Sequence, residues 1–222
     1  MKPAELLGQA TTPDGTDMTL LRRGSEYILL ADGKPLMSSR MHGSEEALAT
    51  FGLVRARQLA APRVLIGGLG MGYSLRAALE ILPVDAAVVV AELMPAIVEW
   101  NRGPLGGLAD RPLADRRVAV DVRDVEHTMV DGSGAFDAIL LDVDNGPTAF
   151  AQAKNGGLYS DRGLALARAA LRPGGVYAVW SAWDDVKFEH RLRYGGFRVE
   201  THRVRARLKR GGPRHTIFVG YL

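Results

Sequence analysis

Two aspartates follow an apolar segment that is typical of a buried strand, and their spacing suggests acid–base chemistry. The segment F-D-A-I-L-L-D ends in Asp142, and Asp144 follows two residues later. Two carboxylates so close together repel each other, which raises the pKa of one of them. The pair could bind an ammonium group and accept its proton, so that the nitrogen attacks as a neutral nucleophile. Asp is also favoured at helix N-caps and in turns, and this alternative stays open for both residues.

A second signal is the glycine-rich segment V-L-I-G-G-L-G-M-G, in which Gly68, Gly70 and Gly72 have the spacing G-x-G-x-G. A chain that passes so quickly from strand to helix needs positive φ angles, and glycine lets a ligand approach the backbone. The N-terminus of the following helix would point at that ligand. Close packing of strand against helix would also select glycine, and this alternative stays open.

The next predicted strand supports a nucleotide site. It ends in Glu92, about twenty residues after the last glycine, where nucleotide-binding α/β folds often place an acid that binds the ribose hydroxyls. The NAD fingerprint would need a third glycine where this chain has Tyr73. The tighter glycine spacing fits ligands of the S-adenosylmethionine type better, and it disfavours an NAD-linked oxidoreductase.

The elements that must position these residues alternate along the chain. Strands are expected at 63–67, 86–91, 117–121, 135–141 and 176–181, and helices at 73–82, 95–102, 124–130 and 161–171. A helix at 184–194 and a hairpin with strands at 197–204 and 215–221 follow. We predict an α/β fold with a doubly wound, mostly parallel seven-stranded sheet.

The N-terminal part has a different pattern. Residues 10–40 predict a small antiparallel meander with strands at 18–21, 27–31 and 35–37. A helix is expected at 44–60, with Ser44 as its N-cap. We therefore divide the chain into an N-terminal β appendage, residues 1–42, and a Rossmann-like domain, residues 43–222.

Composition excludes several kinds of site. The chain has 222 residues, of which 47% are hydrophobic, enough for one sizeable core. It has no cysteine, which rules out disulfides and thiolate nucleophiles, and its five histidines show no metal-ligand spacing, so no metal is predicted. No segment approaches the roughly 18 apolar residues of a membrane helix, and we expect a cytoplasmic protein without a membrane partner.

The net charge of +3 is unevenly distributed. Residues 191–215 hold nine Lys or Arg and one acid, Glu200. This basic hairpin could bind nucleic acid or another partner, but no aromatic interleaving accompanies it, so a solvated basic surface is favoured.

The order of these motifs resembles the spermidine synthase-like proteins, that is, the polyamine aminopropyltransferases and their shorter relatives. The resemblance covers roughly residues 35–190, and the family's V-L-I-x-G-G-G-D-G-G-x-L-R parallels V-L-I-G-G-L-G-M-G-Y-S-L-R here. It implies a class I methyltransferase-like fold and places five residues at the nucleotide site: Gly68, Gly70, Gly72, Glu92 and Asp124.

The same resemblance implies the catalytic residues. Asp142 corresponds to the first aspartate of the family's D-S-S-D-P-x-G-P, which is the proposed base, and Tyr159 corresponds to the tyrosine of its F-Y pair. Asp144 is the second acid, one position closer to Asp142 than the family spacing gives. Met71 stands where the family has an aspartate that contacts the aminopropyl amine, and Trp180 stands near the position of a common glutamine. The nucleotide-site resemblance is therefore more specific than the polyamine-site resemblance.

The leading hypothesis is a transferase that uses S-adenosylmethionine or its decarboxylated form as substrate. It would transfer an aminopropyl or a methyl group to a small-molecule acceptor, an amine in the favoured interpretation. The alternatives are a methyltransferase for another substrate, or a non-catalytic nucleotide-binding protein whose basic hairpin recruits a partner. Whether the protein forms a homodimer stays open.

Overall fold

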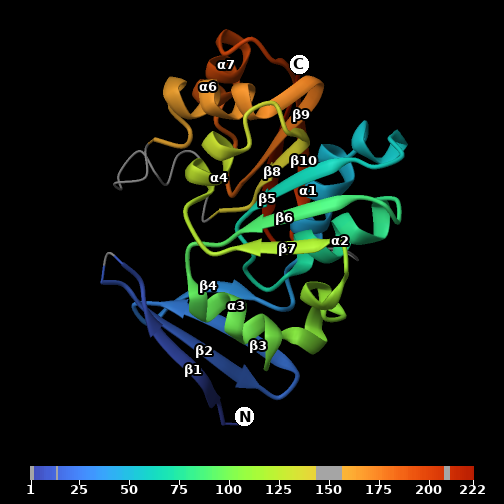
Figure 1. The fold of residues 1–222 in the computed structure, drawn as a ribbon. Helices are drawn as coiled ribbons and strands as arrows, with labels where there is room; N and C mark the ends of the chain where they lie inside the picture. Colours follow the sequence, from blue (N-terminus) through green and yellow to red (C-terminus); the bar gives the residue numbers. More distant parts are fainter. Residues whose placement is uncertain (1–2, 14, 144–156, 208–210) are drawn as a thin grey trace.

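The computed structural model describes residues 3–13, 15–143, 157–207 and 211–222, which form two β-sheets and their flanking helices (Figure 1). Figure 1 shows the small N-terminal sheet beneath the main sheet, next to α3 (Pro95–Arg102). In the described part of the chain, no helix is long and apolar enough to cross a membrane.

The main sheet has seven strands in the order β10-β11-β9-β8-β5-β6-β7. Neighbouring strands are parallel except where β11 pairs with β9 and with β10. This confirms the predicted fold class. The strands are β5 (Arg63–Gly67), β6 (Ala87–Ala91), β7 (Val118–Asp121), β8 (Phe136–Leu141), β9 (Leu171–Ser181), β10 (Arg198–Arg205) and β11 (Arg214–Tyr221).

Helices cover both faces of this sheet because its strands are apolar on both sides. One core contains Val64 and Ile66 together with residues of α1, α2 and α3, and the other contains Leu65 with residues of α4, α6 and α7. The helices besides α3 are α1 (Gly43–Gly52), α2 (Tyr73–Ile81), α4 (Val125–Asp131), α6 (Asp161–Ala170) and α7 (Val186–Tyr194). Strand order reverses between β5 and β8, and a crevice outside the carboxyl ends of such strands is the usual ligand site.

The N-terminal sheet has four antiparallel strands, one more than the sequence predicts. They are β1 (Glu5–Thr11), β2 (Asp17–Arg23), β3 (Glu26–Ala31) and β4 (Lys34–Ser38). The missed strand β1 is an edge strand with a register shift between Leu6 and Gly8. A Cβ at Gly8 would collide with the indole of Trp100 on α3. That contact joins distant parts of the chain, so the local pattern could not indicate it.

The first helix is shorter than expected. α1 ends at Gly52, where a Cβ would collide with Leu140 and Ala178 of the main sheet, and a short 3-10 turn at Ala56–Gln58 follows. The prediction of Ser44 as N-cap was wrong, because the capping residue is His42 and its side chain makes no capping hydrogen bond. The proposed division between residues 42 and 43 stays a prediction.

Candidate functional site

The glycine turn lies between β5 and α2, at the carboxyl end of the central strand. Gly68, Gly70 and Gly72 have φ angles of 88°, 52° and 84°, which are left-handed conformations that favour glycine. The tight turn predicted from the spacing is therefore present.

Packing explains two of these glycines, and the third faces a cavity. A Cβ at Gly68 would collide with the backbone of Asp142, and one at Gly72 would lie 3.0 Å from Asn101 Oδ1. At Gly70 the nearest atom is the mobile end of a side chain, Met37 Cε, at 2.9 Å. Gly70 also lines the cavity described below. The packing alternative thus holds for Gly68 and Gly72, whereas Gly70 is the best candidate for close approach to a ligand.

Glu92 holds the glycine turn in place. Its side chain is buried, Oε2 accepts a hydrogen bond from Leu69 N at 2.8 Å, and Oε1 accepts one from Met94 N at 2.8 Å. Asp124 is likewise engaged, because it caps α4 and accepts a hydrogen bond from Glu126 N at 2.8 Å. The structure gives both acids a structural role, and their binding of ribose and adenine stays a prediction.

Asp142 and Glu45 form a pair of half-buried carboxyl groups beside this turn. Asp142 directly follows β8, and Ser74 of α2 donates a hydrogen bond to its Oδ2. Burial raises the pKa of Asp142 to about 6, although the Ser74 hydrogen bond opposes the rise. Burial, and then the negative charge of Asp142, raise the pKa of Glu45 to about 8. Near neutral pH the pair therefore holds about one proton and one negative charge.

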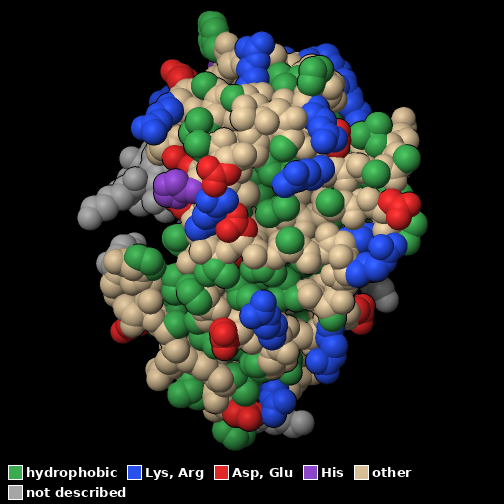
Figure 2. All heavy atoms as spheres, viewed as in Figure 1, with side chains coloured by type: hydrophobic (Ala, Val, Ile, Leu, Met, Phe, Trp, Pro, Cys, Tyr) green, Lys and Arg blue, Asp and Glu red, His purple; other side chains and the backbone are tan. Residues whose placement is uncertain are grey.

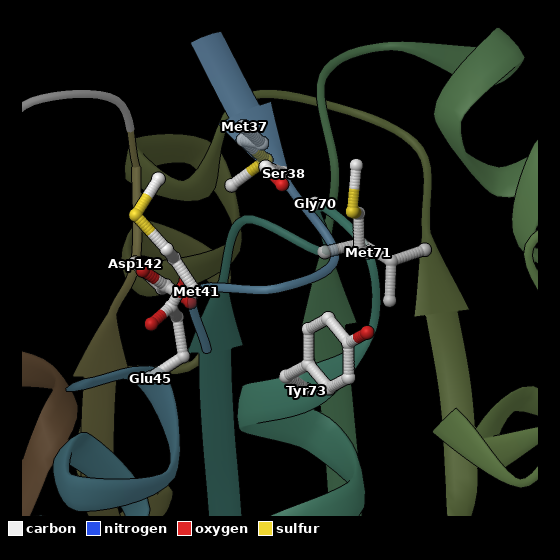
Figure 3. A pocket seen from close by; sticks show the side chains of 9 residues that line it. Met37, Ser38, Met41, Glu45, Gly70, Met71, Tyr73 and Asp142 are labelled. Carbon is white, nitrogen blue, oxygen red and sulfur yellow. The ribbon is translucent and has the colours of Figure 1, made fainter. Parts of the chain in front are cut away.

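Both carboxyl groups line a small cavity whose other walls are largely apolar. Figure 3 shows Glu45 rising from α1 toward Asp142, with Met41 above them and Met71 and Tyr73 on the opposite side. The cavity measures about 10 Å³, which is room for about one water molecule. Unbranched methionine side chains can change rotamer, so they can enlarge such a space for a ligand. The nine lining residues are Met37, Ser38, Met41, Glu45, Leu69, Gly70, Met71, Tyr73 and Asp142.

A second layer of charges supports the cavity wall. His42 stacks on Tyr73 with 4.2 Å between ring centroids, and its Nδ1 lies 2.8 Å from Glu46 Oε1. Arg76 makes an ion pair with the same oxygen of Glu46 and lies over the Tyr73 ring. No sequence motif singles out Arg76 or Glu45. Acidic residues are common in the first turn of a helix because they interact favourably with the helix dipole. Glu45 and Glu46 therefore gave no sign of a functional site in the sequence.

Three predicted residues lie away from the cavity or outside the described residues. Tyr159 is 2% exposed, packs edge-on against Phe188, and donates to Val143 O at 3.4 Å, so this hydrogen bond links it to the neighbour of Asp142. Asp144 lies outside the described residues. Trp180 packs against His215 and does not line the cavity.

Nearby acids pair with several basic residues of the segment 191–215. Arg203 contacts Asp184 at 2.8 Å, and Arg193 contacts Glu189 at 2.7 Å. On the face that Figure 2 shows, the described basic side chains are scattered and form no continuous patch. The described residues also contain no group of three or more His, Asp or Glu that could hold a metal.

Comparison with known proteins connects this geometry to a family. No family model matches the chain. Over 167 residues it is 31% identical to a polyamine aminopropyltransferase of Mycobacterium tuberculosis, and to the same protein of Mycobacterium bovis. The match covers 73% of this chain, and the chain spans about 30% of the length of these relatives.

Solved structures agree with the sequence match. A spermidine synthase from Thermotoga maritima has a TM-score of 0.75 and 16% identity, over 97% of this chain and 72% of that one. A spermidine synthase in complex with the transition state analogue AdoDATO has a TM-score of 0.75 and 14% identity, with the same coverage. A probable spermidine synthase from Corynebacterium glutamicum has a TM-score of 0.67 and 17% identity, over 100% of this chain and 81% of that one. In sequence this chain is therefore similar to part of the polyamine aminopropyltransferases, and its fold is similar to that of spermidine synthases.

Proposed function

We propose that this protein transfers the aminopropyl group of decarboxylated S-adenosylmethionine to a small-molecule amine. The observation that carries the proposal is the Asp142–Glu45 pair, which lines one cavity together with Gly70 of the glycine turn. Anionic groups beside the nucleotide turn suit a cationic acceptor, and the M. tuberculosis and M. bovis relatives are named for this activity.

The residues of the site fit both the nucleotide and the proton transfer. The left-handed turn at Gly70 leaves room for close approach of a ligand, and Glu92 fixes that turn through Leu69 N. An acceptor ammonium would bind next to Asp142 and give it a proton. The nitrogen lone pair then attacks the carbon next to sulfur, the C–S bond breaks, and its electrons stay on sulfur. The products are methylthioadenosine and the aminopropylated amine.

One observation supports a second candidate, methyl transfer from S-adenosylmethionine. The resemblance assigns contact with the aminopropyl amine to an aspartate, and this chain has Met71 at that position, 4% exposed in the cavity wall. Glu45 supplies a second carboxyl group to the same cavity from another element, and it shares one negative charge with Asp142. For this reason we favour the aminopropyl donor.

The test supplies purified protein with each donor and a series of linear diamines, and mass spectrometry identifies both products. Methylthioadenosine and an amine heavier by one aminopropyl group are expected only with the decarboxylated donor. S-adenosylhomocysteine and a methylated amine would establish the second candidate instead. Binding of either donor without turnover would overturn both enzymatic readings.

A further inference from the structure

The last strand of the sheet brings a histidine to the first turn of α1. His215 Nδ1 lies 2.8 Å from Ser44 Oγ, although the two residues are 171 positions apart. Ser44 Oγ also lies 2.7 Å from Glu45 Oε2. Two short hydrogen bonds thus join an imidazole to the carboxyl group that shares the cavity with Asp142.

The serine between them can pass a proton in either direction. A hydroxyl has one proton to donate and can accept as well. When Ser44 donates to an ionised Glu45, His215 must donate its Nδ1–H to Ser44. When Glu45 is protonated it can donate to Ser44, and Ser44 then donates to an unprotonated Nδ1. Glu45, Ser44 and His215 can therefore hold their protons in two ways. The three groups pass from one to the other when each proton moves along its own hydrogen bond.

A transferase needs an exit for the proton that its acceptor loses. The proton that leaves the acceptor amine arrives at a pair of carboxyl groups in a space with room for about one water molecule. Ser44 is fully buried, whereas Glu45, Asp142 and His215 are each partly exposed. The hydrogen-bonded path thus joins the carboxyl pair to a second group that solvent can reach, the ring of His215.

The surroundings of His215 suit a neutral imidazole. It meets Ser44 of α1, the edge of the Trp180 ring of β9 at 4.7 Å between centroids, and its cross-strand partner Val204 of β10. None of these neighbours is charged, and burial lowers the pKa of His215. A neutral ring can accept a proton at one nitrogen and release one from the other.

Glu45, in contrast, is surrounded by charge. Asp142 faces it across the cavity, and Glu46 follows it on α1. Glu46 is itself paired with Arg76 and with His42. Asp142 is therefore the main acid that Glu45 responds to, which couples the two carboxyl groups.

We propose that Ser44 and His215 form a proton relay that carries the acceptor's proton from the Asp142–Glu45 pair to solvent. This inference rests on the proposed transferase function. An N–H bond of the acceptor breaks as an O–H bond forms on Asp142. Glu45, which already holds a proton, protonates Ser44 as Ser44 protonates His215 Nδ1, and His215 releases its Nε2 proton to water. The proton on Asp142 then passes to the ionised Glu45. No net charge accumulates, and the relay is reset when His215 exchanges its ring protons with water and returns to the Nε2–H tautomer.

Ser44 and His215 are positioning and relay residues, so the test separates turnover from binding. His215→Ala and Ser44→Ala should lower kcat roughly 10- to 100-fold and leave KM for the amine within about two-fold. Added imidazole should restore most of the kcat of His215→Ala and none of that of Ser44→Ala. His190→Ala, an exposed histidine on α7, is the matched control and should leave kcat unchanged. A normal kcat in both relay variants, or no rescue by imidazole, would overturn the relay.

A second measurement needs no activity. In ¹³C- and ¹⁵N-labelled protein, the ring nitrogens of His215 should report the titration of Glu45, and Ser44→Ala should abolish that response while the protein stays folded. If the chemical shifts of the His215 ring nitrogens do not change as Glu45 titrates in the folded wild-type protein, the proposed hydrogen-bonded connection is refuted. If the wild-type protein shows no turnover but His215 still responds to the titration of Glu45, the proposed function fails. The hydrogen-bonded connection between Glu45 and His215 is then still supported.

Discussion

Ser74 donates a hydrogen bond to Asp142 although the two residues are 68 positions apart. Ser74 lies in the first turn of α2, directly after the glycine turn, and Asp142 directly follows β8. The bond therefore ties the proposed nucleotide turn to the proposed base, at the point where strand order reverses. It also opposes the rise that burial causes in the pKa of Asp142. The conformation of the glycine turn consequently affects how readily Asp142 accepts a proton.

Asp142→Asn should separate catalysis from binding. The amide keeps the size of the side chain and removes its charge, so turnover should fall roughly 10²- to 10⁴-fold with nucleotide affinity nearly intact. In wild type the rate should rise with pH through an apparent pKa of about 6, because Asp142 must lose its proton to act as base. The pH–rate profile of Asp142→Asn should lack this rise. A proportional loss of nucleotide affinity, measured by calorimetry, would make Asp142 a ligand contact instead.

Glu45→Gln should stabilise the protein at high pH. The folded state binds the Glu45 proton more tightly than the unfolded chain does, because its pKa rises from 4.5 to about 8. The contribution of this group to stability is therefore full below about pH 4.5 and is lost as the pH rises toward 8. We expect the Tm of Glu45→Gln to exceed that of wild type by roughly 2 to 6 °C at pH 8, with a smaller gap at pH 5.

The control for Glu45 is Glu80→Gln on α2, whose side chain is 67% exposed. Its Tm should follow that of wild type at every pH. A gap for Glu45→Gln that does not widen with pH would mean that Glu45 is ionised in the folded protein at pH 5.

Glu92→Gln should weaken both the turn and the binding of adenosyl ligands. An amide can replace one of the two acceptor oxygens, so either Leu69 N or Met94 N loses its partner. Leaving one such buried donor unpaired costs about 1 to 3 kcal/mol of unfolding free energy. If Glu92 also binds the ribose, donor affinity measured by calorimetry should fall by a similar amount. A folded variant with lower Tm and unchanged affinity would restrict Glu92 to its structural role.

Gly68 and Gly70 should respond differently to substitution. Gly70→Val adds a side chain beside flexible Met37, so it should abolish donor binding and lower the Tm only moderately. Gly68→Val meets the rigid backbone of Asp142 and should unfold much of the protein. Thermal denaturation with and without donor compares them. Normal donor binding by Gly70→Val would mean that the turn serves packing alone.

The sequence predicted the parts of the fold that depend on local pattern. The boundaries of β5 and α3 were correct because an apolar run into glycine, and Pro95 at a helix start, are local signals. The ends of α1 and the edge strand β1 depend on contacts such as Gly8 with Trp100, which local pattern does not contain.

The same division holds for the site. Asp142 was identified from its place at the end of a strand, whereas Glu45 and His215 become relevant only because α1 and β11 meet in space. Motif spacing identifies Asp142 because it directly follows a strand. It does not identify Glu45 and His215, which lie on a distant helix and on the last strand.

Met71→Asp should change the choice of donor. The resemblance gives the aspartate at this position contact with the aminopropyl amine, and Met71 lines the cavity that Glu45 and Asp142 share. A carboxylate there would attract the terminal ammonium that both donors carry, and it would repel the carboxylate that S-adenosylmethionine alone carries. The ratio of kcat/KM for the two donors should therefore shift toward the decarboxylated form by about 10-fold or more, the effect of one charged hydrogen bond. Met71→Asn has nearly the same shape without the charge and should not shift it. An equal shift in both variants would point to cavity size, and no shift in either would remove Met71 from the donor's amine end.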